Sequence, residues 1–293
     1  MRPILRPGTH VLHRSPGQLQ VGLHPQRAVL LPDTAPVRAT LGALGRSLPV
    51  EAHTDAATLS LLAEADLLLD ERSLLPLLGT EPGVRRHAVA ALARRLGDDG
   101  PPAHRSRAEC IIDLRDDGSG LGRRLHEQLG SLLVDAGVRR PPKSRPRHPG
   151  LGMLVAVGEP DRELTDDWTR AGTPYAVLRL TEGDAVVGPF VAPSRTACLR
   201  CVDAHCTDAD PAWPLLVRQY ARAAAHERGD GAPEPVDPPL ATVAVGWLAR
   251  DVVTFLDGGT PTSWSATVVL DPELRNIEIR RWLRHPECGC AWM

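Results

Sequence analysis

Two cysteine pairs set far apart in the chain constrain its fold more than any other feature. The first pair is Cys198 and Cys201, and the second is Cys288 and Cys290, close to the end of the sequence. Zinc binds four soft ligands in a tetrahedron, and two short cysteine turns supply two ligands each. The spacing therefore predicts a structural zinc site that clips the C-terminal segment onto the middle of the fold, with no open coordination position for chemistry.

The surroundings of the cysteines favour a metal over disulfides. Residues 1–9 contain Arg and Pro but no apolar stretch of the kind found in an export signal. A chain without such a signal is expected in the cytoplasm, where thiols stay reduced. Cys110 lies in an apolar run and is expected to be a buried core thiol. Cys206 and His285 are second choices as zinc ligands.

Length, charge and composition narrow the class of protein. At 293 residues the chain has room for about two domains. Its formal net charge of -2 creates no strong field toward nucleic acid or an anionic membrane. Aromatic residues make up 3% of the chain, which argues against stacking platforms for single strands. No apolar stretch approaches the length needed to span a bilayer, so we expect neither nucleic acid nor membrane as a partner.

The N-terminal part, residues 1–82, is predicted to be a small winged-helix domain. Alternating and turn residues indicate three short strands, at 10–14, 19–23 and 28–31. Helical periodicity follows at 35–44 and 55–64, and a third helical region runs through 67–69 into 71–78.

The third helical region decides which ligand such a domain would take. It contains Leu67, Leu68 and Leu69 followed by Asp70 and Glu71, whereas a DNA recognition helix offers Arg or Lys to phosphates and bases. An apolar helix beside an edge strand is typical of peptide capture by strand addition. A winged-helix regulator with a zinc-containing sensor domain is the alternative.

The middle of the chain has the order of a nucleotide-binding fold but not its residues. A strand at 109–114 is followed by a glycine-rich stretch at 117–122 and a helix at 123–136, an order that places a phosphate at a helix N-terminus. The glycine spacing does not match G-x-G-x-x-G, and Asp116 and Asp117 would repel a phosphate. A basic, proline-rich linker at 139–147 stands where the second strand is expected. ATP is therefore not expected as a cofactor.

Several segments together resemble a known family. They are the run Val187-Gly188-Pro189-Phe190 with Cys198 and Cys201, the apolar helix and hairpin at 240–280, the closing run 284–290, and the opening runs 5–11 and 19–23. These residues are similar to the ThiF-like, ubiquitin-activating-type fold. More narrowly, they resemble its members in gene clusters for thiazole/oxazole-modified peptides and thiopeptides, known as cyclodehydratase partners or leader peptide-binding proteins. The resemblance covers most of the chain.

The resemblance implies an α/β architecture with a division of labour. Residues 83–293 would form a degenerate ThiF-like Rossmann-type α/β domain with a structural zinc. The N-terminal domain would bind the leader of a precursor peptide and present it to a YcaO-type enzyme, which uses ATP to cyclise Cys, Ser or Thr. The chain itself is then expected to carry no catalytic residue.

The leader site follows by position. The leader would lie along a strand, with a helix on its other side, and the peptide-binding residues would be Ala28, Val29, Leu30, Leu31, Leu67, Leu68, Leu69 and Arg72. Each leucine taken alone is more readily explained as a core residue. The alternative is an ATP-dependent ThiF-type adenylating enzyme, for which Arg123 and Arg124 are the basic residues directly after the glycines. Whether the chain forms a homodimer, as adenylating relatives commonly do, stays open.

Overall fold

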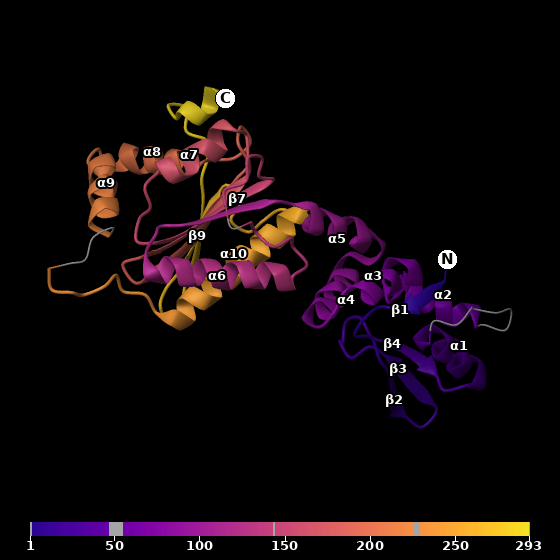
Figure 1. Cartoon of the computed structure of the whole chain (residues 1–293). Coiled ribbons are helices and arrows are strands. Elements are labelled where there is room, and N and C mark those ends of the chain that lie inside the picture. Colours follow the sequence, from indigo (N-terminus) through magenta and orange to yellow (C-terminus); the bar gives the residue numbers. More distant parts are fainter. Residues whose placement is uncertain (1, 47–54, 143, 225–228, 293) are drawn as a thin grey trace. The chain divides into compact units, whose positions relative to one another are not determined.

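The computed structural model describes residues 2–46, 55–142, 144–224 and 229–292, and the chain forms two compact units, residues 1–105 and 106–293 (Figure 1). The domain boundary predicted from the sequence, at 82/83, lies inside the first unit. The separate role of residues 1–82 stays a prediction.

The first unit begins with a three-stranded antiparallel sheet in the order β2-β3-β4. These strands match the three predicted ones, and their bounds are β2 Val11–Ser15, β3 Gln18–Val21 and β4 Val29–Pro32. Helices α1 (Ala35–Gly45) and α2 (Ala56–Glu64) follow, close to the predicted ranges. The alternating residues Leu19, Val21 and Leu31 are buried against apolar side chains of both helices, because successive strand residues point to opposite faces.

The predicted third helix is wrong at its start. Leu68–Asp70 forms strand β5, which pairs antiparallel with an unpredicted strand β1 (Pro3–Leu5). Arg72 lies in a short 3-10 turn, and the helix α3 begins only at Leu75 and ends at Thr80. A short run of leucines has no periodicity that separates strand from helix, and the partner strand lies more than 60 residues away in the chain. The argument against DNA binding that used this helix loses its premise.

Two further helices complete the first unit and lead out of it. They were not predicted, and their bounds are α4 Val84–Leu96 and α5 Gly100–Glu109. Helix α4 packs Val89 and Ala93 against Ile4, Leu69 and Leu74.

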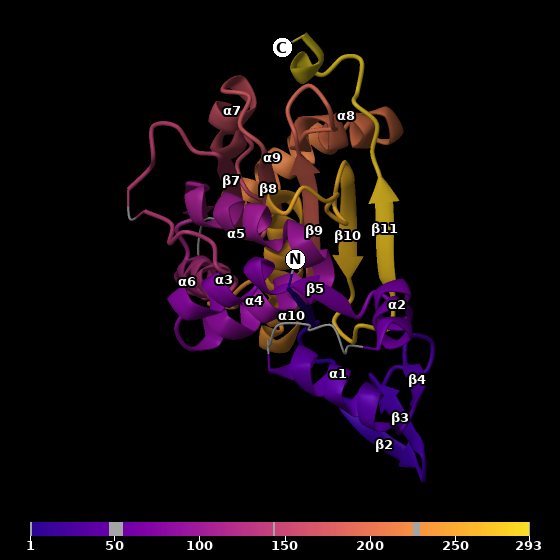
Figure 2. The same cartoon turned by 90° about the vertical axis from the view of Figure 1, so that its right-hand side faces the viewer.

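The second unit is built on a six-stranded mixed sheet in the order β11-β10-β9-β8-β7-β6 (Figure 2). The strands are β6 Ile112–Asp116, β7 Leu151–Val157, β8 Tyr175–Thr181, β9 Asp184–Val191, β10 Ala266–Leu270 and β11 Ile277–Arg281. Strands β6 to β8 are parallel, and each later strand is antiparallel to its neighbour. The switch occurs at a two-residue turn where Glu182 and Gly183 both have positive φ, a type I′ geometry that suits a tight hairpin.

Helices cover both faces of this sheet. Their bounds are α6 Gly120–Asp135, α7 Glu163–Arg170, α8 Leu199–Ala209, α9 Trp213–Ala224 and α10 Pro238–Leu256. Helices α6 and α10 lie on one face (Figure 1), over Met153 and Val155 of β7. Leu154 between them points to the other face, where Trp168 of α7 and the cysteines of α8 pack.

The sequence prediction for these helices was partly right. The glycine-rich stretch forms the first turn of α6, which therefore starts three residues before the predicted helix. Helix α8 was not predicted. The sequence also predicts a helix at 212–227, which corresponds to α9, and residues 225–227 of that range lie outside the described residues. The linker at 139–147 contains no helix or strand in its described part, as predicted.

Helix α10 corrects the expectation that no apolar stretch approaches the length of a membrane span. By length and composition alone it would suffice. Half of its apolar window is buried inside the unit, with Leu240, Val245, Leu248 and Val252 in the main core. The buried side of α10 is thus part of the core of the second unit.

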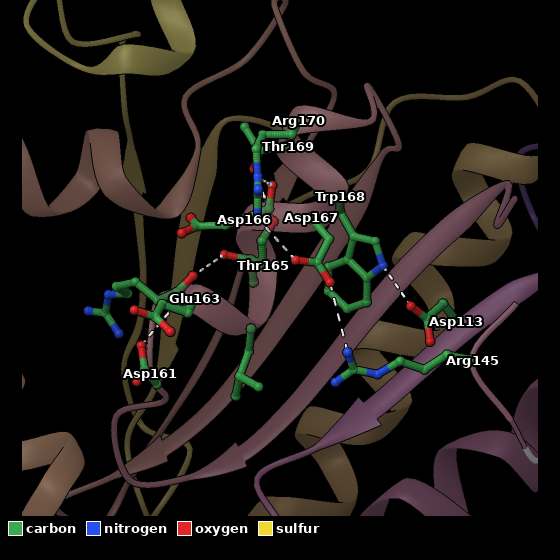
Figure 3. A network of polar contacts seen from close by, with 12 residues as sticks. Asp113, Arg145, Asp161, Glu163, Thr165, Asp166, Asp167, Trp168, Thr169 and Arg170 are labelled. Atoms are coloured by element: carbon green, nitrogen blue, oxygen red, sulfur yellow. Dashed lines mark hydrogen bonds and ion pairs between the residues drawn. The ribbon is translucent and has the colours of Figure 1, made fainter. Parts of the chain in front are cut away.

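Helix α7 is anchored to the parallel strands by a polar network (Figure 3). The buried carboxylate of Asp113 on β6 accepts a hydrogen bond from the Trp168 indole N–H (2.8 Å) and two from Arg115 (2.7 and 2.9 Å). The Arg115 guanidinium lies 4.1 Å from the Trp168 ring centroid. Gly152 on β7 is required here, because a Cβ would overlap the Trp168 ring.

Candidate functional site

The four predicted zinc ligands come together in one buried cluster. Their Sγ atoms all lie within 4.8 Å of one another, and the closest approaches are 3.3 Å and 3.6 Å. A disulfide would bring two sulfurs to about 2.0 Å, and all four cysteines are free. Four sulfurs at about 2.3 Å from a zinc ion lie about 3.8 Å apart in a tetrahedron. The observed arrangement therefore needs only a small expansion to hold zinc.

The local folding of each cysteine pair explains how two sulfurs face one direction. Cys198 precedes the first residue of α8, and Cys201 lies in its first turn, so the first pair belongs to a helix start and not to a turn as predicted. Positions three apart on a helix lie on the same side. Cys288 and Cys290 lie at the start of a 3-10 turn, Gly289–Trp292. The cluster thus joins the end of the chain to α8.

The protonation of the thiols suits a metal ligand set. A hydrogen bond from the Cys198 thiol lowers the pKa of Cys201 to about 4, and the same hydrogen bond is the main cause that raises the pKa of Cys198. Burial raises the pKa of Cys290 to about 12. Cysteine binds a metal as the thiolate, so a cation among the four sulfurs would compensate the thiolate charges that the ligand set requires.

The remaining ligand candidates lie outside this cluster. Cys110 packs against the main core, and burial raises its pKa to about 11, as expected for a structural thiol. Cys206 is half-buried on α8. The His285 Nε2 lies 3.0 Å from an Asp208 carboxylate oxygen, and its Nδ1 accepts a hydrogen bond from the backbone N–H of Glu287. His285 therefore holds the turn that presents Cys288.

The glycine-rich loop at the start of α6 is closed by its own side chains. One carboxylate oxygen of Asp117 accepts from the Ser119 backbone N–H (2.9 Å), and the other accepts from the Val157 N–H at the end of β7 (2.6 Å). The Ser119 hydroxyl caps the Gly122 N–H (2.8 Å). The Asp117 carboxylate thus lies at the helix N-terminus, where a nucleotide phosphate is expected in an intact fold of this order.

A cavity of about 930 Å³ opens beside this loop. Its lining carries many charged side chains, and a group of them around Arg162 is paired. Arg162 binds Asp203 of α8 through two hydrogen bonds (2.7 and 2.9 Å) and Glu159 through one (2.7 Å), and Arg179 also binds Glu159 (2.8 Å). Sequence reasoning missed this group. The signal was the charged run 159–163 directly after the buried strand β7.

Electrostatics hold these carboxylates in the charged state. Burial opposes the ionisation of Glu159, yet Arg179 and Arg162 bring its pKa below the ordinary value. Burial likewise opposes the ionisation of Asp203, and the hydrogen bonds from Arg162 are the main cause that lowers its pKa. The group is a set of ion pairs that joins the segment between β7 and α7 to β8 and α8.

The eight predicted peptide-binding residues all lie in the first unit, on or beside two strands of different sheets, β4 and β5. Val29, Leu31, Leu67 and Leu68 share one hydrophobic cluster, whereas Leu69 packs in a neighbouring one. Leu31, Leu67 and Leu69 are buried core residues, as expected for each leucine taken alone. Among the others, the half-buried residues are Ala28, Val29 and Leu68, and the exposed ones are Leu30 and Arg72.

Strand β4 is an edge of its sheet, and its backbone groups alternate between β3 and the open side. The Asp33 N–H donates to Gly17 O (2.8 Å) in the register that pairs Leu31 with β3. Because antiparallel pairs alternate, Leu31 and Val29 point their backbone groups to β3, and Leu30 points its N–H and C=O away from the sheet. The Leu30 side chain is 45% exposed.

No protein-family model matches the chain, and no curated protein matches it in sequence. Solved structures do match its fold. The heterocyclase TruD is 16% identical over 99% of this chain, with a TM-score of 0.67. A heterocyclase solved with substrate and cofactor is 14% identical over 99% of this chain, also with a TM-score of 0.67. Escherichia coli MccB, solved with ATP, is 12% identical over 99% of this chain, with a TM-score of 0.60.

These likenesses establish the fold. The chain has the ThiF-like α/β fold of MccB and of the matching part of TruD, which confirms the resemblance predicted from the sequence at the level of fold. The match covers the whole length of MccB but only 42% and 39% of the two heterocyclase chains.

Proposed function

We propose that this chain binds the leader of a ribosomal precursor peptide and presents it to a YcaO-type, ATP-dependent cyclodehydratase that makes azoles or azolines. It would act as a docking subunit without a catalytic residue of its own. The fold of heterocyclases, one of them solved with its substrate, supports a role in azole peptide biosynthesis.

The single observation that favours a peptide-binding role over an ATP-dependent reaction is the position of Asp117. Its carboxylate accepts the backbone N–H groups of Ser119 and Val157 at the α6 N-terminus. A phosphate there would have to displace this carboxylate from both donors and approach Asp116 as well. Nucleotide chemistry is therefore assigned to the partner enzyme.

The leader site is proposed at the open edge of β4. An added strand would bond to the outward N–H and C=O of Leu30 and place side chains over the exposed surface beside it. Three of the eight predicted residues are core, so in this proposal Leu31, Leu67 and Leu69 support the groove from beneath without direct contact.

Zinc is proposed as the one resident cofactor, held by Cys198, Cys201, Cys288 and Cys290. The four thiols fill a tetrahedron and leave no position for water, so the metal would supply stability and no reaction.

One observation favours a second function, an ATP-dependent adenylating enzyme. MccB, which has been solved with ATP, matches over its whole length. The cavity of about 930 Å³ beside the α6 N-terminus is large enough for a nucleotide. Against it, Asp117 occupies the backbone donors at the α6 N-terminus, and the lining arginines Arg162 and Arg200 already bind carboxylates.

The test is a fluorescence titration of the purified protein with a labelled leader peptide from the neighbouring gene cluster, with ATP and a DNA duplex in parallel. Leader binding in the micromolar range or tighter, without ATP or DNA binding, is expected. ATP binding without leader binding would move the protein to the adenylating enzymes, and salt-sensitive DNA binding would favour the regulator.

A matched pair of proline variants locates the leader. Leu30→Pro removes the outward N–H of β4 and leaves the bonds to β3 intact. Val11→Pro does the same at the opposite edge of the sheet, because the Gly22 N–H to His10 O bond places the Val11 groups outward. The affinity for the leader is expected to fall at least about tenfold for Leu30→Pro, because a backbone hydrogen bond between β4 and the added strand is lost. The affinity should stay unchanged for Val11→Pro. The reverse result would remove β4 from the proposal.

A further inference from the structure

Strand β11 is the outermost strand of the six-stranded sheet (Figure 2), and no described strand pairs with its outer side. All five of its residues are exposed, whereas β6 at the other edge has no exposed residue. Its register with β10 is uninterrupted, so no bulge twists the edge away. The strand contains neither Pro nor Lys, and Ile277 and Ile279 remain 50% and 46% exposed. Soluble proteins usually blunt such an edge, so an open one indicates a partner strand.

The backbone of β11 determines which residues can bond to a partner. The Trp282 N–H donates to Ser265 O (2.7 Å) in the same register as the β10–β11 pairs. Because hydrogen-bonded pairs alternate along an antiparallel ladder, Arg280 and Glu278 also point their backbone groups to β10. The outward N–H and C=O groups belong to the alternate residues, Ile277, Ile279 and Arg281.

The sequence of β11 is complementary to itself in the antiparallel direction. Pairing two copies about Ile279 sets Ile279 opposite its own counterpart and Ile277 opposite Arg281 of the partner subunit, so all outward groups find partners. The same register sets Glu278 opposite Arg280 of the partner subunit, twice by symmetry. Directly opposite strand residues share a face, and opposite charges there stabilise the pair. Centring the pair on Ile277 or Arg281 loses this charge match.

The position of Arg280 adds to the match. Its guanidinium lies 4.1 Å from the ring centroid of Trp282, which is itself buried and donates to the Thr267 hydroxyl (3.0 Å). A guanidinium restrained on an aromatic face loses less side-chain entropy when it forms an ion pair.

We infer that β11 is an interface between two copies of this chain, which pair antiparallel about Ile279 into a continuous twelve-stranded sheet. A two-fold contact of this kind is self-complementary by construction, and it leaves β6 of each copy as the two outer strands of the joined sheet. The inference does not depend on the leader-binding proposal, since it uses a different unit of the chain.

Charge exchange across the two-fold axis tests the register. Analytical ultracentrifugation of the full chain over a micromolar concentration series should give a dimer. Glu278→Arg and Arg280→Glu each oppose like charges, and each should raise the dimer dissociation constant at least about tenfold. The double variant E278R/R280E restores opposite charges and should recover the dimer. Arg275→Glu makes the same charge change on the same hairpin outside the ladder and should have no effect.

Ile279→Pro provides an independent test, because it removes the central outward N–H while the bonds to β10 remain. It should abolish the dimer at unchanged zinc content. A wild-type chain that stays monomeric throughout, or a dimer indifferent to both single charge variants, would overturn the inference. So would a monomer that loses leader binding in Arg280→Glu, since the edge would then belong to the peptide.

Discussion

The cysteine cluster and the glycine-rich loop lie in the same unit, and both collect polar groups suited to an ion. In the cluster, the four thiols face one another, and three pairs of Sγ atoms lie 3.3–3.6 Å apart. In the loop, the N–H groups of Ser119 and Val157 already have a carboxylate partner from Asp117. The difference teaches that a site can bind an ion when its polar groups have no partner within the protein. The position of the site in the fold matters less.

The two sites also differ in what they connect. Cys198 and Cys288 are 90 residues apart, so a metal there closes a long loop of chain. Asp117 and Ser119 are neighbours on one loop, and only the bond to Val157 reaches another strand. Damage to the cluster should therefore spread through the unit, whereas damage to the loop should remain local.

The largest effect is expected from the cluster. Cys201→Ser should lower the zinc content, measured by mass spectrometry of metals, from one ion per chain to near none. In small zinc domains the metal contributes about 10–16 kcal/mol to folding. A third of that amount, about 3.3–5.3 kcal/mol, would lower the Tm by about 7–21 °C, at about 2–4 °C per kcal/mol.

Cys206→Ser is the matched control for this prediction, because it removes a thiol from the same helix that lies outside the cluster. It should keep the zinc and change the Tm little. A Cys201→Ser protein that is soluble and zinc-free with the Tm of wild type would contradict the view that the cluster holds the unit together.

The next effect concerns Arg162, which joins the helix of the cluster to the cavity beside the loop. Arg162→Met leaves Glu159 and Asp203 partly uncompensated, and breaking a buried ion pair from one side costs about 3–5 kcal/mol. Urea unfolding followed by circular dichroism measures the change. Arg200→Met is the control, since Arg200 binds Asp166 with the same two-bond geometry (2.7 and 2.9 Å) at an exposed position.

The exposed pair should contribute no more than about 1 kcal/mol. Equal losses of unfolding free energy in the two arginine variants would show that the buried group around Arg162 stabilises the fold no more than a surface ion pair does.

How far the sequence predicted these two sites depends on the range of the contacts. The four cysteines were predictable as a candidate metal site, because two closely spaced cysteine pairs indicate such a site whichever helices or strands surround them. The acidic residues before α6 predicted poor phosphate binding. That the Asp117 side chain bonds to Val157, 40 residues away, was not predictable, since it depends on how β7 ends against the loop.

The same limit explains the errors in the fold. The sequence predicts the buried strands β7 and β8 from the apolar runs at 151–157 and 175–180, which a parallel sheet covered on both faces requires. The leucines at 67–69 were placed on a helix because their strand partner, Pro3–Leu5, is recognisable only after folding. Helix α4 was missed because its sequence is dominated by Ala and Arg, with few apolar residues to show a period.

A smaller effect is expected at the loop itself. Asp117→Ala frees the Val157 and Ser119 N–H groups and should cost about 1–3 kcal/mol, the usual penalty for unsatisfied buried donors. The freed N–H groups should then donate hydrogen bonds to an anion. Inorganic phosphate at constant ionic strength should therefore raise the Tm of Asp117→Ala more than that of wild type.

Asp161→Ala controls for charge, because it removes one carboxylate from the lining of the same cavity without freeing the donors on Ser119 and Val157. It should respond to phosphate as wild type does. An equal phosphate response in all three proteins would mean that the Asp117 carboxylate is not what closes the loop to anions.

The smallest effect is expected in acid. The folded-state pKa values of Glu159 and Asp203 lie below their ordinary values of 4.5 and 3.8. The unfolded chain therefore binds more protons as the pH falls, and the stabilisation from these carboxylates is complete above about pH 5 and is lost as the pH drops through the folded-state pKa values. In Arg162→Met the carboxylates lack this partner, so protonation relieves an unpaired charge.

The gap in unfolding free energy between wild type and Arg162→Met should consequently be constant from neutral pH to about pH 5 and narrow below it. Both proteins keep the four cysteines, so protonation of the thiols cancels in the difference. The gap for Arg200→Met should not narrow in this way, because its ion pair is solvated. A gap that stays constant for Arg162→Met down to acid unfolding would place its stability loss in packing and not in charge.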